Sequence, residues 1–143
     1  MDIVHELIAH APPPKVYAAL TTPALLASWF TDQVETEADP HSSVAVGTEI
    51  AFRFRQGVIR VRVAELVPHQ KVVWEILQGL PGWEGVTGTM TWTLTTPYPG
   101  TMIHMRQMGW PSMDGAYPSS NHRIGTLIDQ MRALVEASEV EPA

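Results

Sequence analysis

The last part of the chain carries a helical pattern that constrains the whole fold, because one of its faces must be covered. We predict a helix from Ser120 to Glu139, over the segment SNHRIGTLIDQMRALVEASE. Its apolar residues recur three and four positions apart, the spacing of a single helical face, at Ile124, Leu127, Ile128, Met131, Leu134 and Val135. Charged residues fall on the opposite face, which we expect in solvent. The rest of the chain must therefore supply an apolar partner surface.

Most of the remaining segments show the alternation of β-strands. Period two is clearest in residues 86–95, where Met90, Trp92 and Leu94 alternate with threonines. We predict further strands at residues 2–9, 33–37, 48–55, 58–67, 72–77 and 101–108. Two short helices are expected after the first strand, at about residues 13–20 and 22–30, because proline is tolerated in the first turn of a helix. This order predicts an α+β domain in which one long helix closes the concave face of a curved antiparallel sheet.

Length and composition restrict the class of protein. The 143 residues fit a single domain, residues 1–143. We expect neither membrane insertion nor export, because no apolar run approaches about 18 residues and no signal sequence is recognisable. The absence of cysteine favours the cytoplasm. A net charge of -6 with few basic residues offers little to nucleic-acid phosphates, so no nucleic-acid partner is expected.

Residues around the two predicted short helices carry a resemblance to a known family. They are Pro14, Val16, Tyr17, Ala19, Leu20, Thr21, Thr22, Pro23, Leu26, Trp29 and Phe30. This run resembles START-like domains of the activator of Hsp90 ATPase homologue type, within the SRPBCC or Bet v 1-like superfamily, and the similarity covers nearly the whole chain. Two departures stand out. Ile124 and Gly125 occupy the place of a usual tryptophan, and Gln107 that of a frequent histidine.

The resemblance implies a helix-grip fold. In that fold a seven-stranded curved antiparallel sheet wraps around the long C-terminal helix, two short helices follow the first strand, and an apolar cavity lies between sheet and helix. The family register would turn Ile103, Met105 and Gln107 inward, whereas the alternative would turn His104 and Arg106 inward. The fold does not imply one reaction, because it serves carriers, cyclases, hydrolases and co-chaperones.

The candidate ligand-binding residues are mostly large apolar side chains that would line this cavity. They are Trp29, Phe52, Val63, Glu65, Trp74, Trp92, Met105, Gln107, Ile124, Leu127, Ile128 and Met131. Tryptophans bury large areas, so simple core filling is the alternative interpretation for them. Trp83 and Trp110 fall in loops, where an exposed indole at a cavity mouth could contact a ligand. Gly125 either permits close packing against a strand or widens the cavity.

Glu65 is the candidate for acid–base chemistry, because it continues the strand face of Val61 and Val63. A carboxylate facing an apolar cavity would have a raised pKa and could act as an acid or base, or bind a ligand hydroxyl. A bulge that turns Glu65 to solvent is the equal alternative. The six histidines lack the spacing of a zinc motif and no cysteine accompanies them, so no metal or other cofactor is expected.

Three functions follow from these observations. The first is a binding protein that holds a hydrophobic or aromatic small molecule, such as a lipid, polyketide or flavonoid-like compound, between sheet and helix without turnover. The second is a cyclase or hydrolase of the same superfamily that uses a pocket acid–base residue. The third is a co-chaperone that stimulates the Hsp90 ATPase, although nothing in the chain corresponds to that activator's second domain. The sequence names no protein partner.

Overall fold

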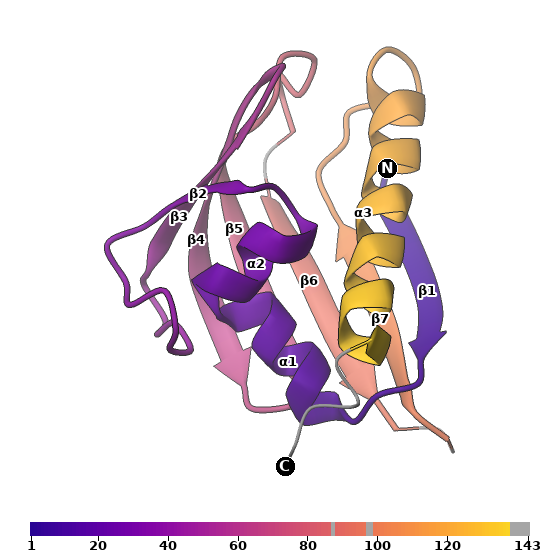
Figure 1. Cartoon of the computed structure of the whole chain (residues 1–143). Helices are drawn as coiled ribbons and strands as arrows, with labels where there is room; N and C mark the ends of the chain where they lie inside the picture. The colour runs from indigo at the N-terminus through magenta and orange to yellow at the C-terminus, as the bar shows by residue number, and fades with distance from the viewer. Residues whose placement is uncertain (87, 97–98, 138–143) are drawn as a thin grey trace.

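A seven-stranded antiparallel sheet and one long helix form the framework (Figure 1). In this computed structural model, which describes residues 1–86, 88–96 and 99–137, the strand order is β1-β7-β6-β5-β4-β3-β2. The strands are β1 (Ile3–Ala9), β2 (Gln33–Glu35), β3 (Glu49–Phe54), β4 (Gly57–Val67), β5 (Lys71–Gln78), β6 (Gly88–Thr95) and β7 (Thr101–Gln107). The helices are α1 (Pro13–Thr21), α2 (Pro23–Trp29) and α3 (Tyr117–Ala137). The predicted helix-grip architecture is confirmed.

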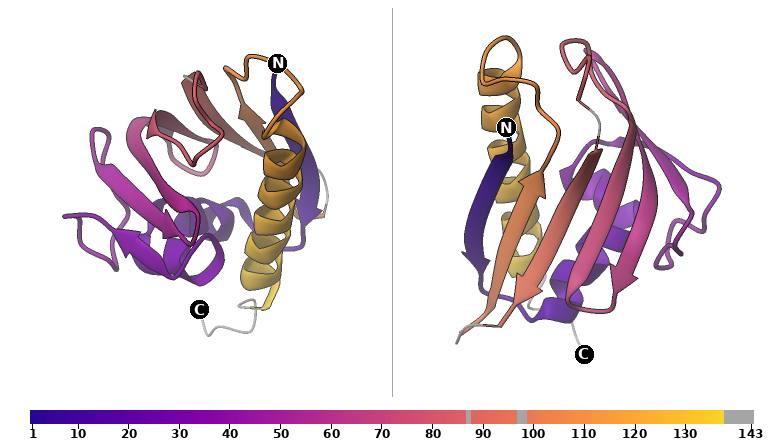
Figure 2. Two further views of the ribbon diagram at one scale, coloured as in Figure 1. Left: turned by 90° about the horizontal axis from the view of Figure 1, so that it is seen from above. Right: turned by 180° about the vertical axis from the view of Figure 1, so that it is seen from behind.

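The sheet is curved, and all three helices lie on its concave side. Seen from above, the strands follow an arc around α3, and the view from behind shows them covering the helices (Figure 2). The inward side chains of β6, Met90, Trp92 and Leu94, are buried, whereas the threonines between them are partly exposed. Alternation along the strands therefore directs the apolar side chains toward the helices. No helix formed by the described residues has the length and apolar character required to cross a membrane.

The last strand has the register that the family resemblance implies. Ile103, Met105 and Gln107 are at most 1% exposed and face the helices. His104 and Arg106 lie on the outer side, near Glu6 of β1 and near Asp2, which precedes β1, respectively. The alternative with His104 and Arg106 inward is therefore wrong.

Prolines open the two short helices, as predicted. Pro13 and Pro23 each stand at the beginning of their helix, where a missing N–H loses no hydrogen bond. Thr22 is the cap of α2 by position only, because its hydroxyl makes no capping hydrogen bond. Its backbone carbonyl instead accepts from Leu26 N–H at 2.9 Å. The indole N–H of Trp29 donates to the Ala19 carbonyl at 2.8 Å, which fixes α2 against α1.

Two predicted boundaries shift in the structure. The helix α3 begins at Tyr117, three residues before the predicted start, because Pro118 is accommodated in the first turn. The Tyr117 hydroxyl donates to the Asp2 carbonyl at 2.7 Å, which ties this end of α3 to the start of β1. The predicted last residues, 138 and 139, lie outside the described residues. Val86 is a turn residue and precedes β6, because its N–H donates to the Trp83 carbonyl at 2.9 Å.

Candidate functional site

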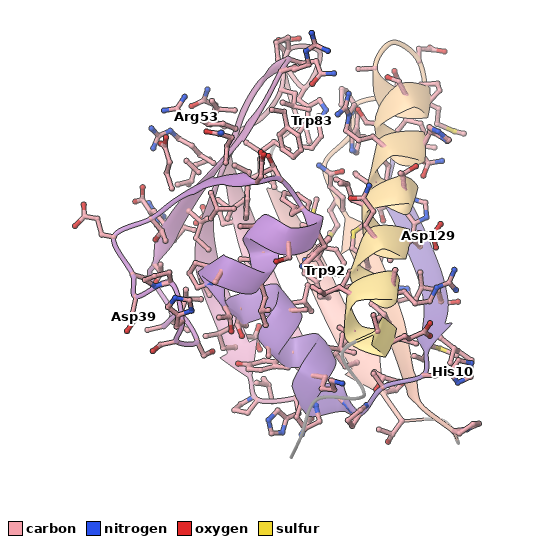
Figure 3. The ribbon with its side chains drawn as sticks, in the orientation of Figure 1. His10, Asp39, Arg53, Trp83, Trp92 and Asp129 are labelled. Atoms are coloured by element: carbon pink, nitrogen blue, oxygen red, sulfur yellow. The ribbon has the colours of Figure 1, made fainter. Side chains whose placement is uncertain are left out.

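The predicted ligand-binding residues lie in the interior between the sheet and α3, with one exception. Eleven of the twelve are at most 9% exposed: Trp29, Phe52, Val63, Trp74, Trp92, Met105, Gln107, Ile124, Leu127, Ile128 and Met131. Figure 3 shows Trp92 between the α1–α2 pair and α3. The apolar members pack in one core, and no open cavity is found between them among the described residues. Side chains therefore occupy the space where the resemblance implied a cavity.

Aromatic rings form the wall of this interior on the side of β3, β5 and β6. Phe52 lies 4.5 Å from Phe30 and 5.6 Å from Trp74, measured between ring centroids. Trp74 lies 5.4 Å from Trp92, which in turn lies 5.9 Å from Trp29. Most of these pairs are edge-to-face, the arrangement that ring quadrupoles favour. Trp29 and Phe30, at the end of α2, pack against the rings of the three strands, so that together they form one continuous apolar cluster.

Several polar atoms in this interior have no hydrogen-bond partner among the described residues. They are the indole N–H groups of Trp74, Trp92 and Trp110, and both polar atoms of the Gln107 side-chain amide. A buried polar group left without a partner costs about 1–3 kcal/mol, and native proteins contain few. Each of these four side chains therefore requires a partner that the described residues do not supply, such as an ordered water or a bound ligand.

Strand register brings three of these side chains close together. Gln107 of β7 stands opposite Met90 of β6, and the next inward pair is Met105 opposite Trp92. Gln107 and Trp92 are therefore diagonal neighbours on one face of the sheet. Trp74 of β5 stands on the other side of Met90. The unpartnered atoms thus come from three adjacent strands, with Gln107 and Trp74 in one cross-strand row and Trp92 in the next.

Other buried polar side chains of the domain form hydrogen bonds within the protein. The Trp83 indole donates to the Ser120 hydroxyl at 3.0 Å. Thr101 donates to the Ala11 carbonyl at 2.6 Å, and Thr21 to the Tyr17 carbonyl at 2.8 Å. Burial in this fold is thus compatible with full hydrogen bonding, which makes the unpaired Gln107 amide an exception that requires an explanation.

Glu65 is the predicted site residue that lies outside the interior. The pairing of β4 with β5 shifts between Val63, which faces Trp74, and Glu65, which faces Val73. The extra residue forms a bulge that breaks the alternation and turns Glu65 outward. Its carboxylate is half exposed and lies 3.2 Å from the Lys71 ammonium group. Of the two alternatives for Glu65, the structure shows the bulge.

The two loop tryptophans are buried, contrary to the prediction of an exposed indole at a cavity mouth. Trp83 and Trp110 are each 4% exposed, with ring centroids 5.6 Å apart. Tyr117 adds a third ring, 5.6 Å from Trp110. Trp83 can fold back because residue 79 is glycine: a Cβ there would lie 2.6 Å from the Cβ of Trp83. That glycine is the sequence signal that the prediction missed.

A surface groove of about 470 Å³ lies between β1 and α3. Its floor includes His5, Gly125 and the core residue Ile128. Gly125 permits close packing against the strand, since a Cβ there would lie 2.9 Å from Cε1 of His5. The Nε2 atom of His5 lies 3.1 Å from the Asn121 carbonyl oxygen. The His5 ring thus fills the space beside Gly125.

Among the described residues no ionisable side chain is fully buried, and His5 is partly buried between β1 and α3. The buried polar side chains of the described residues are all uncharged: Thr21, Thr101, Gln107 and Ser120. Partial burial raises the pKa of Tyr17, whereas a hydrogen bond from Arg53 on the outer face lowers the pKa of Glu35. The part of the chain that the structure describes also contains no group of three His, Asp or Glu side chains placed to hold a metal ion.

Solved structures of known proteins share this fold. The chain is similar to the Aha1 dimer of Colwellia psychrerythraea, with 24% identity, a TM-score of 0.83, and coverage of 97% of this chain and 98% of that one. It is similar to protein MLL2253 of Mesorhizobium loti, with 22% identity, a TM-score of 0.77, and coverage of 98% and 100%. It also matches DynU16, from the dynemicin biosynthetic locus, with 19% identity and a TM-score of 0.70, over 96% of this chain but 48% of that one. These likenesses establish the fold.

A comparison with curated proteins finds no match. The family model for Activator of Hsp90 ATPase homolog 1-like protein matches residues 10–136. The match runs from the residue after β1 to the last turn of α3, and so includes most of the sheet and all three helices. The chain therefore belongs to the family of Activator of Hsp90 ATPase homolog 1-like proteins.

Proposed function

We propose that this domain binds a hydrophobic or aromatic small molecule between its sheet and α3. The observation that carries the proposal is the set of buried polar atoms without partners at Trp74, Trp92 and Gln107. A core selected for stability alone would pair these atoms or replace them by apolar groups, because either change removes an unfavourable contribution. A ligand that offers hydrogen-bonding groups would satisfy them.

The apolar wall would supply most of the binding free energy. Burial of apolar ligand surface against the rings of Phe52, Trp74 and Trp92 is worth about 25 cal/mol for each square ångström. The polar atoms would then fix the orientation of the ligand, as a few polar groups do in most small-molecule sites.

Binding requires side chains to move, because the described residues leave no open space between sheet and helix. Met90, Met105 and Met131 are the core residues best suited to this, since unbranched thioether side chains repack easily. The groove between β1 and α3 reaches Ile128 and offers a route from solvent toward these methionines.

The interior supports binding better than catalysis. Glu65, the predicted acid–base residue, is on the outer face and paired with Lys71. Among the described residues, no ionisable side chain is buried between sheet and α3. A cyclase or hydrolase would therefore depend on the partly buried His5 at the groove between β1 and α3 as its general acid or base.

Ligand binding can be tested by tryptophan fluorescence and thermal unfolding. We expect 2-acetylnaphthalene and flavone to change the indole emission, because Trp74 and Trp92 line the site, and to raise the melting temperature through binding to the folded state. N-acetyltryptophanamide is the control for inner-filter effects. Native mass spectrometry of the protein as purified from cells is the second measurement. The proposal fails if neither probe changes emission or melting temperature and the protein carries no bound molecule from the cell.

A further inference from the structure

The same interior also limits the chemistry of the ligand, if the proposed function holds. We infer that the ligand is an uncharged molecule with a hydrogen-bond-accepting oxygen, and that Gln107 recognises this oxygen together with the indole N–H of Trp92. Gln107 is fully buried, and both polar atoms of its amide lack a partner among the described residues.

The charge of the ligand follows from the charges around the site. The cations on the neighbouring strands lie on the outer face and are already paired: Arg106 lies 2.7 Å from Asp2, and Lys71 lies 3.2 Å from Glu65. A charge moved into an apolar interior without a partner is strongly destabilised. An anionic ligand, such as a fatty acid at neutral pH, would thus be poorly accommodated.

Arg123 is the cation that faces the sheet from α3. Its guanidinium carbon lies 5.9 Å from the centroid of the Phe54 ring, on a half-buried part of the surface. Phe54 is itself partly exposed, so Arg123 lies at the rim of the interior, whereas Gln107 is fully buried. A ligand that carried an anionic group to Arg123 is the competing arrangement, and the experiment includes a carboxylate to test it.

The need for an acceptor follows from the count of donors. An indole N–H is a donor only, whereas a glutamine amide offers two N–H donors and one acceptor oxygen. The unpartnered atoms of Trp74, Trp92 and Gln107 therefore include more donor hydrogens than acceptor oxygens. A hydrocarbon would leave all of them unpaired. A ketone, quinone or ether oxygen would accept from two diagonal neighbours, Gln107 and Trp92.

Three probes with the same naphthalene ring separate these possibilities at neutral pH. They are 2-ethylnaphthalene, without an acceptor; 2-acetylnaphthalene, with a neutral acceptor; and 2-naphthoate, with a charged one. We expect the ketone to bind about three- to tenfold more tightly than the hydrocarbon, the usual contribution of a net hydrogen bond. The carboxylate is expected to bind at least about tenfold more weakly than the ketone. Fluorescence titration gives all three dissociation constants.

Substitutions then test whether Gln107 is the residue that recognises the ketone oxygen. Gln107→Met keeps the length of the side chain and removes its hydrogen-bonding atoms, so the ketone should bind this variant about as weakly as the hydrocarbon does. Affinity for 2-ethylnaphthalene should not fall. Trp92→Phe, which keeps a ring and removes the N–H, should lower affinity for the ketone more than for the hydrocarbon. Gln130→Met, on the exposed face of α3, is the matched control and should leave the dissociation constants of all three probes unchanged.

The possible results distinguish failure of the inference from failure of the proposed function on which it rests. Equal binding of hydrocarbon and ketone to the wild type, or an unchanged preference in Gln107→Met, overturns the inference and leaves the binding function intact. Binding of 2-naphthoate as tight as that of the ketone also overturns it, in favour of Arg123. If none of the three probes binds, the inference is wrong. The proposed function is wrong as well if flavone also fails to bind and the protein carries no bound molecule from the cell.

Discussion

The two faces of the sheet differ in whether their polar side chains are paired. On the outer face, Arg53 lies 2.7 Å from Glu35, and Arg62 lies 3.0 Å from Glu75, although water alone would have satisfied these side chains. Figure 3 shows Arg53 on the side of the sheet away from α3. On the inner face, where water is excluded, Gln107 and the indole N–H of Trp92 have no partner among the described residues. Pairing is thus present on the outer face, where it contributes little, and missing at Gln107 and Trp92, where it would contribute most.

This difference separates the part of the domain that maintains the fold from the part that we expect to act. Exposed ion pairs contribute about 0–1 kcal/mol each, so the outer face has little effect on stability. Unpaired buried groups lower stability by about 1–3 kcal/mol each, so in folded proteins an ordered water or a ligand usually satisfies them. The inner face therefore combines the apolar packing that stabilises the domain with polar atoms reserved for a ligand.

The largest effect is expected from removal of an inner ring. Phe52 is fully buried between Phe30 and Trp74, so Phe52→Ala should lower the free energy of unfolding by about 3–5 kcal/mol through lost burial and a new cavity. Val4→Ala on the outer side of β1, where Val4 is 48% exposed, is the control and should change it by less than about 0.5 kcal/mol. Urea unfolding followed by circular dichroism measures both. A loss below about 1 kcal/mol for Phe52→Ala would contradict tight packing of the inner face.

The second expected effect is an increase in the free energy of unfolding. In the ligand-free protein, Gln107→Met should raise the free energy of unfolding by about 1–3 kcal/mol, because it removes a buried amide without partners and keeps the side-chain volume. Gln130→Met on the exposed face of α3 should change the free energy of unfolding by about zero. The measurement is again urea unfolding, after any molecule carried over from the cell has been extracted. A destabilised Gln107→Met protein would mean that the amide has a stabilising role, and the contrast between the two faces would disappear.

Much of the fold was predictable from the sequence because its elements depend on local physics. Strict alternation at Met90, Trp92 and Leu94 assigned β6 and its buried face. Prolines 13 and 23 located the starts of the short helices, since proline fits only the first turn. The family resemblance supplied the sheet topology and the inward register of Gln107, which no local pattern in β7 determines.

The rest depends on contacts between distant segments. Alternation could not decide whether Glu65 points inward or is turned outward by a bulge, because one extra residue leaves no clear mark on the pattern of β4. The burial of Trp83 depends on Ser120, 37 positions away in the sequence. The unpartnered state of the Gln107 amide is a property of its whole surroundings, so the sequence could propose Gln107 as a polar contact but could not single it out.

A third prediction concerns the packing of β1 against α3. Gly125→Ala should have little net effect, because a gain of about 1 kcal/mol in helix propensity is offset by displacement of the His5 ring and loss of its contact with the Asn121 carbonyl. In a His5→Ala background the same change should stabilise by about 1 kcal/mol, since only the propensity gain remains. A double-mutant cycle measures this coupling. Equal effects of Gly125→Ala in the two backgrounds would show that His5 does not occupy the space beside Gly125.

The smallest effect belongs to the outer face and depends on pH. The hydrogen bond from Arg53 lowers the pKa of Glu35, and the same contact raises the pKa of Arg53. A carboxyl group whose pKa is lower in the folded than in the unfolded state stabilises the fold above its unfolded pKa. That contribution is lost as the pH falls through the folded-state pKa.

Glu35→Gln should therefore be slightly less stable than the wild type at neutral pH, and the two urea midpoints should converge as Glu35 is protonated in acid. High salt should also reduce the difference at neutral pH, because both side chains are about half exposed and their charges are screened by ions. Thr31 donates to the Arg53 backbone carbonyl at 2.7 Å, so Thr31→Val perturbs the same strand without altering a titratable group and serves as the control. A midpoint difference that survived acid or salt would show that Glu35 stabilises the edge of the sheet through packing rather than charge, and the outer face would then resemble the inner one more than we infer.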